Sequence, residues 1–185
     1  MTGYRREFLR SAAAAATLFG LAGGMTRVFA QSTDSPDAGF GAAEWMRIPS
    51  IGVDSHVSEV GITGGFYDVP WFDIGHHADS PGPGDLGNAV FNGHVVTINA
   101  GEVFRHLDQV RRGDAIYIYT PTSRLDWVAI DTFSVDQNDN SFLDDTPEPR
   151  ITLYTCTGEF NPIERSYAER LVVTAQLVNT SARES

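Results

Sequence analysis

The chain has 185 residues, 42% of them hydrophobic and 11% aromatic, which is enough for one domain with a substantial core and a short appendage. Its 24 acidic residues against 13 basic residues give a formal net charge of −11. That charge argues against nucleic acid and anionic lipid surfaces as partners, because both are bound mainly through lysine and arginine.

The first thirty residues have the pattern of a targeting segment. A basic stretch at residues 4–10 (YRREFLR) precedes a small, apolar stretch at residues 11–21, and small residues occupy the −3 and −1 positions of a cleavage site. The arginine pair resembles a twin-arginine export signal. We predict that residues 1–30 are a signal peptide or an N-terminal anchor, and that any attachment to the membrane is through these residues. The protein is then expected to be extracytoplasmic, at the cell surface. Residues 31–43, rich in Ser, Asp, Gly and Pro, are predicted to be a flexible linker.

Residues 44–178 are predicted to form an all-β domain, followed by a polar tail at residues 179–185. The clearest alternation of apolar and polar side chains runs through residues 171–177. Only residues 101–110 have the spacing of a short helix. Many short strands joined by turns favour a closed barrel or a sandwich. Further strands are expected at residues 88–96, 114–120, 125–130 and 150–156.

Cys156 is the only cysteine of the chain, so it cannot form an internal disulfide. The thiol is an inert buried group, an intermolecular crosslink or a nucleophile. Side-chain alternation along the strand puts Ile151 and Leu153 on one face and Cys156 on the other. The same argument turns Arg170 away from the aliphatic face of residues 171–177. A thiol and a guanidinium therefore face one groove, provided that neither strand carries a bulge.

A nucleophilic cysteine needs a base or a positive neighbour, because a thiol with a pKa of about 8.5 is mostly protonated at neutral pH. Among the five histidines, His94 follows an apolar run and a glycine, a context that suits a side chain at a strand end. His106 is the second choice. The adjacent pair His76 and His77 suggests a metal site. However, neighbouring residues of a strand point to opposite sides, and no Cys, His or carboxylate set at ligand spacing accompanies the pair. We predict no metal and no cofactor.

Several segments, in chain order, resemble motifs of the sortase family of extracytoplasmic cysteine transpeptidases. The segment TLYTC at the cysteine matches the family signature T-L-x-T-C in full, and the resemblance covers about residues 45–178. The matching segments are RIPSIGVD at residues 47–54, GPGDLG at 82–87, NAVFNGHV at 88–95, TLYTC at 152–156 and RLVVTA at 170–175.

The resemblance implies a closed, eight-stranded sortase-type β-barrel with short helices, and it implies a role for each matching residue. Cys156 would attack the Thr–Gly amide of an LPxTG-like sorting signal to form a thioacyl enzyme. His94 would protonate the leaving amine and then deprotonate the incoming one, and Arg170 would stabilise the oxyanion. Thr155 and Arg165 are assigned to substrate binding: Thr155 as a residue that orders the site, and Arg165 as the alternative to Arg170.

The implied partners are secreted proteins that carry a sorting signal and an amine acceptor on a peptidoglycan precursor or a pilin lysine. The segment TGEFNP at residues 157–162 resembles the class E and F sortases. Two other functions remain open on the sequence alone: a thiol hydrolase with the same three residues, in which water is the acceptor, and a noncatalytic exported β-barrel binding module in which Cys156 is structural.

Overall fold

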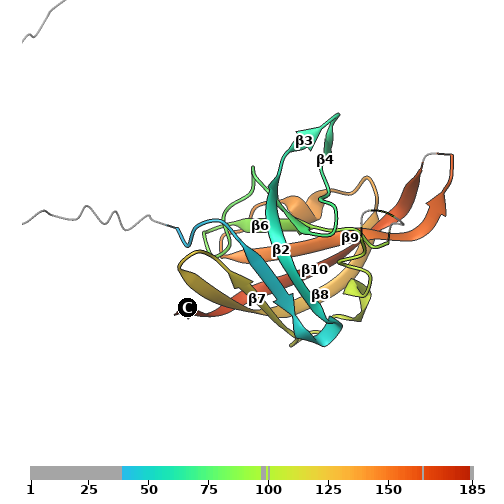
Figure 1. The fold of residues 1–185 in the computed structure, drawn as a ribbon. Coiled ribbons are helices and arrows are strands. Elements are labelled where there is room, and N and C mark those ends of the chain that lie inside the picture. The colour runs from blue at the N-terminus through green and yellow to red at the C-terminus, as the bar shows by residue number, and fades with distance from the viewer. Residues whose placement is uncertain (1–38, 97–98, 100, 164, 184–185) are drawn as a thin grey trace, which may run out of the picture. The chain divides into compact units, whose positions relative to one another are not determined.

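The computed structural model describes residues 39–96, 99, 101–163 and 165–183 (Figure 1). The predicted targeting segment and most of the predicted linker lie outside these residues. Eight strands pair in the order β1-β2-β5-β6-β9-β10-β8-β7 and close into a barrel. The predicted all-β fold and the closed eight-stranded barrel are therefore confirmed.

The barrel strands are β1 (Trp45–Ile48), β2 (Val53–Val60), β5 (Ile74–His77), β6 (Asn88–Asn92), β7 (Ala115–Tyr119), β8 (Ser123–Asp136), β9 (Arg150–Asn161) and β10 (Ser166–Ala182). Strands β3 (Ile62–Thr63) and β4 (Phe66–Tyr67) form a separate hairpin that projects from the barrel (Figure 1). The short helices among the described residues are 3-10 turns: η1 (Pro49–Ile51), η2 (Leu107–Gln109) and η3 (Ser141–Leu143).

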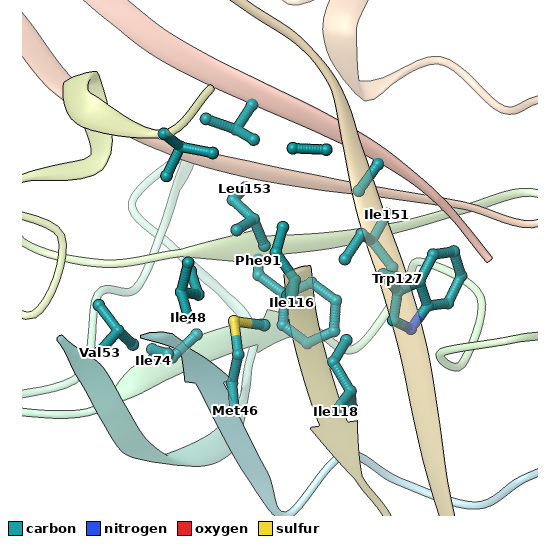
Figure 2. Packing of buried hydrophobic residues seen from close by; sticks show 14 of the residues in the cluster. Met46, Ile48, Val53, Ile74, Phe91, Ile116, Ile118, Trp127, Ile151 and Leu153 are labelled. Carbon is teal, nitrogen blue, oxygen red and sulfur yellow. The ribbon is translucent and has the colours of Figure 1, made fainter. Parts of the chain in front are cut away.

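The barrel is filled by one face of each strand. Ile116 and Ile118 of β7 and Trp127 of β8 are fully buried, as the alternation of apolar and polar residues in those segments requires (Figure 2). Phe91 of β6 and Leu153 of β9 meet them from the opposite wall. Fully burying a side chain of this size stabilises the fold by roughly 1.5–3 kcal/mol. This interior makes a rigid support for whatever lies on the outer face of β6 and β9.

The short helix predicted at residues 101–110 is present only in part. These residues form no α-helix: they make turns that end in the 3-10 helix η2. The helical spacing in that segment arises because Phe104 and Leu107 both reach the core from successive turns. Residues 47–54 contain the turn between β1 and β2: Pro49 opens the 3-10 turn η1, and the left-handed backbone at Gly52 leads the chain back antiparallel as β2.

The pairing of β9 with β10 is regular where it concerns the cysteine. Partners run without interruption from Glu169 to Gln176 on β10, and the irregularity in this pairing lies before Glu169. No bulge therefore interrupts the pairing between Cys156 and Arg170, as the alternation argument requires. Strand β10 itself continues past the predicted domain end at residue 178 as far as Ala182, paired with the start of β8.

Candidate active site

Three adjacent strands of the barrel carry the predicted catalytic residues or lead into them. Strand β6 runs parallel to β9 with Asn92 opposite Tyr154, and continuing that register by two residues sets His94 beside Cys156. On the other side of β9, Cys156 is the direct antiparallel partner of Arg170. The order β6-β9-β10 in the barrel therefore brings the backbone positions of His94, Cys156 and Arg170 onto or next to three neighbouring strands.

Thr155 fixes the junction between β6 and β9. Its side chain is buried, and its hydroxyl donates a hydrogen bond to the carbonyl of Gly93 at 2.7 Å. This contact extends the β6–β9 alignment past the last paired residue of β6 and places the backbone immediately before His94. Thr155 thus fixes the backbone of Gly93, the residue before His94; its expected roles in ordering the site and in substrate binding stay predictions.

Cys156 lies on the outer face of β9. Ile151 and Leu153 are fully buried in the core on the opposite face, which confirms the predicted alternation, while Cys156 is half-buried. The outer face is not uniformly open, because Thr152 on the same side is also buried and donates to Asn88 Oδ1 at 2.7 Å. The thiol therefore lies where the covered part of this face gives way to solvent.

Burial raises the pKa of the Cys156 thiol, and the positive charge of Arg170 opposes this rise. Burial lowers the pKa of His94, and a hydrogen bond with the backbone of Val69 opposes this fall. At neutral pH the resting pair is therefore a neutral thiol and a neutral imidazole, since the first pKa lies above its ordinary value and the second below. The reactive thiolate with an imidazolium is a minor form of the site.

The two candidate arginines differ in position. Arg170 is half-buried, and its Nη1 donates to the carbonyls of Tyr167 and Glu169 at 3.2 and 3.0 Å, which fixes the guanidinium at this end of β10. Arg165 is exposed in the turn between β9 and β10, with a positive φ of 53°. Only Arg170 is a register partner of Cys156. The binding role assigned to Arg165 stays a prediction.

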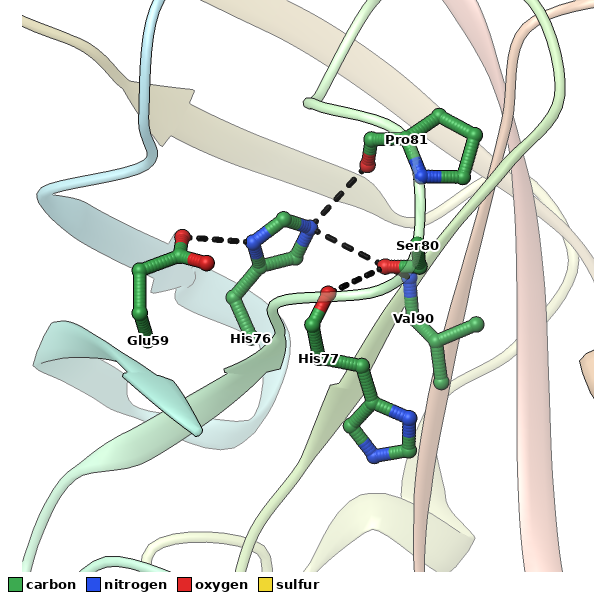
Figure 3. A network of polar contacts seen from close by, with 6 residues as sticks. All are labelled: Glu59, His76, His77, Ser80, Pro81 and Val90. Carbon is green, nitrogen blue, oxygen red and sulfur yellow. Dashed lines mark hydrogen bonds and ion pairs between the residues drawn. The ribbon is translucent and has the colours of Figure 1, made fainter. Parts of the chain in front are cut away.

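The two adjacent histidines of β5 form separate contacts rather than a common site. Figure 3 shows their rings on different sides of the strand: His76 Nδ1 lies 2.7 Å from Glu59 Oε1, and its Nε2 lies 3.1 Å from the carbonyl of Pro81. His77 Nε2 instead lies 3.1 Å from the hydroxyl of Tyr154. In the described part of the chain, no three His, Cys, Asp or Glu side chains are grouped to hold a metal ion.

The sequence did not reveal a polar cluster on the strands that lead to His94 and Cys156. It consists of His77, Asn92 and Tyr154, which come from β5, β6 and β9. Burial lowers the pKa of His77 to about 4, so this ring is neutral. Alternation already placed Tyr154 on the face of Cys156, but nothing in the sequence pattern indicated that β5 and β6 would deliver a histidine and an asparagine to its hydroxyl.

Comparison with known proteins decides the family. The profile of the Sortase domain matches residues 46–178. The chain belongs to the sortase family. As a sortase it is a cysteine transpeptidase.

Solved sortase structures resemble the chain over most of the barrel. The Sortase D5 transpeptidase of Clostridium perfringens is 31% identical, with a TM-score of 0.61 over 75% of this chain and 79% of that one. Sortase A of Listeria monocytogenes (22% identical) and Sortase E1 of Streptomyces coelicolor with a tripeptide in its active site (24% identical) share the fold, each with a TM-score of 0.64 over 78% of this sortase and 92% of theirs. No match was found among curated proteins. Because these sortases belong to different classes, the resemblance to classes E and F stays a prediction.

Among the described residues, no helix has the length and apolar character needed to cross a membrane.

Proposed function

We propose that this sortase cleaves an LPxTG-like sorting signal at the C-terminus of an exported protein and transfers that protein to an amine of the cell wall or of a pilin. The observation that carries the proposal is the pairing of Cys156 with Arg170; the parallel pairing of β6 with β9, which ends two residues before His94, supports a place for the imidazole on the other side of the thiol. A nucleophile, an acid–base group and a cation at one level of a rigid wall are the groups that amide exchange through a thioester requires.

The acylation half begins with transfer of the thiol proton from Cys156 to His94. The thiolate attacks the Thr carbonyl of the Thr–Gly bond, so an S–C bond forms and negative charge develops on the oxygen, where the guanidinium of Arg170 stabilises it. The C–N bond then breaks as His94 gives its proton to the leaving amine. The products are a thioacyl enzyme and the released C-terminal peptide, with the imidazole neutral again.

The transfer half reverses these roles. An incoming amine attacks the thioester carbonyl, and His94 takes the proton that the amine loses. The C–S bond breaks, a new amide forms, and the thiolate of Cys156 recovers its proton from His94. Water in place of the amine would give hydrolysis, so the acceptor distinguishes transferase from hydrolase.

The proposed setting is outside the cytoplasm. The support is the export-like pattern of residues 1–30, together with the acidic character of the chain, which disfavours intracellular nucleic acid partners. The proposed partners are secreted proteins that carry sorting signals, and a peptidoglycan precursor or a pilin lysine as the amine acceptor.

The experiment is cleavage of an LPxTG peptide, with and without triglycine, followed by mass spectrometry of the products. We expect the parent to give a ligated product with triglycine and Cys156→Ala to give none, while the neighbouring substitution Thr157→Ala leaves the reaction in place. Free acid alone from the parent would indicate a hydrolase. Cleavage by C156A at the parental rate would exclude both enzymatic functions.

A further inference from the structure

Asn92 ends strand β6, two residues before His94, and its side chain is 1% exposed. Its amide nitrogen donates a hydrogen bond to the carbonyl of Asp68 at 3.0 Å. The next residue, Val69, makes a backbone hydrogen bond with the imidazole of His94. Asn92 therefore holds, from the barrel wall, the same short backbone segment that holds His94.

The side chain of Asn92 is itself fixed by its surroundings. Its Nδ2 lies 3.4 Å from Nε2 of His77 and 3.5 Å from the hydroxyl of Tyr154, and these two groups are 3.1 Å apart. The ring of Tyr67, on the same segment as Asp68, stacks on His77 with a centroid distance of 3.5 Å. The segment between β4 and β5 is thus attached to the wall both by stacking and by the asparagine amide.

The cost of this arrangement points to a role other than stability. The Oδ1 atom of Asn92 is buried and has no hydrogen-bond partner among the described residues. A buried polar atom without a partner is destabilising, and an apolar side chain at this position would avoid that cost. What the asparagine supplies instead is a donor aimed at the Asp68 carbonyl.

We propose that Asn92 is a positioning residue for His94: by fixing the Asp68–Val69 backbone, it sets the orientation of the imidazole toward Cys156. This inference rests on the proposed acid–base role of His94. The Asn92 side chain is hydrogen-bonded to Asp68, His77 and Tyr154. Its effect on His94 therefore runs through the backbone of Val69.

The chain offers a matched control on the same strand. Asn88 opens β6, is also 1% exposed, and donates through Nδ2 to the carbonyls of Phe142 and Asp144 at 3.0 and 3.2 Å. Those carbonyls belong to the segment around η3, not to the segment that holds His94. Loss of either asparagine removes a buried amide from the same strand, but only loss of Asn92 releases the contact to His94.

The test compares the full-length parent with Asn92→Ala and Asn88→Ala. Turnover of the LPxTG peptide is measured, and the pKa of His94 is measured without substrate by NMR of ¹³C-histidine-labelled protein, with the signal identified by His94→Gln. For N92A we expect kcat to fall by about 10- to 100-fold with little change in KM, as a misplaced catalytic group produces. We also expect a lower His94 pKa, because the Val69 hydrogen bond that favours the charged ring weakens. For N88A we expect the parental His94 pKa.

The near-isosteric change Asn92→Leu provides a second variant if N92A does not fold. It keeps the side-chain shape and adds no charge but removes the donor to Asp68, so it should lower the His94 pKa as N92A does. A parental His94 pKa in folded N92A or N92L, or the same fall of the His94 pKa in N88A, would overturn the positioning role. Because the pKa is measured without substrate, that result is distinguishable from a failure of the proposed transfer, which would appear as loss of ligation in the parent itself.

Discussion

The β9–β10 hairpin contains two regions that each carry an arginine after Cys156 but differ in structure. In the paired region, Arg170 is the direct partner of Cys156. In the turn, Arg165 is exposed, lies nearer to the cysteine along the chain, and is separated from the paired region by an irregularity between Tyr167 and Glu169. The comparison teaches that strand register, and not distance along the sequence, decides which cation meets the thiol.

The same contrast separates two histidines. His94 leaves β6 at the level of Cys156, whereas His106 lies in the turns before η2, exposed, with its Nδ1 3.1 Å from Nε2 of Gln109. We expect His94→Ala to lower kcat for the sorting peptide by about 10²–10⁴-fold, since it removes the acid–base group. His106→Ala should stay close to the parent. A steady-state assay with both variants checks this, and a larger loss in H106A would show that register chose the wrong histidine.

The second prediction concerns the arginines. Arg170→Ala should lower kcat by about 10²–10³-fold, the usual loss when one donor to a developing oxyanion is removed. Arg165→Ala, which removes the same charge from the turn, should have a much smaller effect on kcat. Peptide-cleavage kinetics of the two variants measure the difference directly. Equal losses would mean that the turn folds into the site when substrate binds.

The smallest expected effect is on the titration of the thiol. Arg170 lowers the pKa of Cys156 against the rise caused by burial, so R170A should raise this pKa further. The alkylation rate by iodoacetamide, which follows the thiolate, should then rise at a higher pH than in the parent. Arg170→Lys, which keeps the charge, should leave the profile nearer to the parental one. An unchanged pH profile of alkylation in R170A would show that the charge of Arg170 does not affect the pKa of Cys156.

Much of the fold was readable from local patterns. The strand expected at residues 114–120 and the alternation at 171–177 correspond to β7 and to the middle of β10. Closure of the barrel was implied by the family resemblance, since the local patterns also allowed a sandwich. The helix predicted at residues 101–110 is reduced to turns and η2, because the backbone there makes i→i−3 hydrogen bonds, as from Leu107 to Phe104, and not the i→i−4 bonds of an α-helix. Local periodicity reports which side chains are buried more faithfully than it reports backbone geometry.

The candidate site was predictable only in part. Alternation could orient Cys156 and Arg170, because no irregularity interrupts the pairing between them. It could not find the cluster of His77, Asn92 and Tyr154, because that cluster depends on β5 and β6 being neighbours and on β6 pairing with β9. A single histidine, asparagine or tyrosine in a strand gives no sign in the sequence that it belongs to such a cluster. Long-range strand order is the information that a single sequence lacks.

The raised pKa of Cys156 also bears on the durability of the enzyme. Outside the cytoplasm, where we propose that it works, a thiol is not kept reduced by the glutathione and thioredoxin systems. Oxidation to sulfenic acid proceeds through the thiolate, so a cysteine that rests as the neutral thiol is attacked slowly by peroxide. Burial on the outer face of β9 thus limits the reactive fraction at any moment. We therefore expect the only thiol of the chain to resist peroxide between encounters with its substrate.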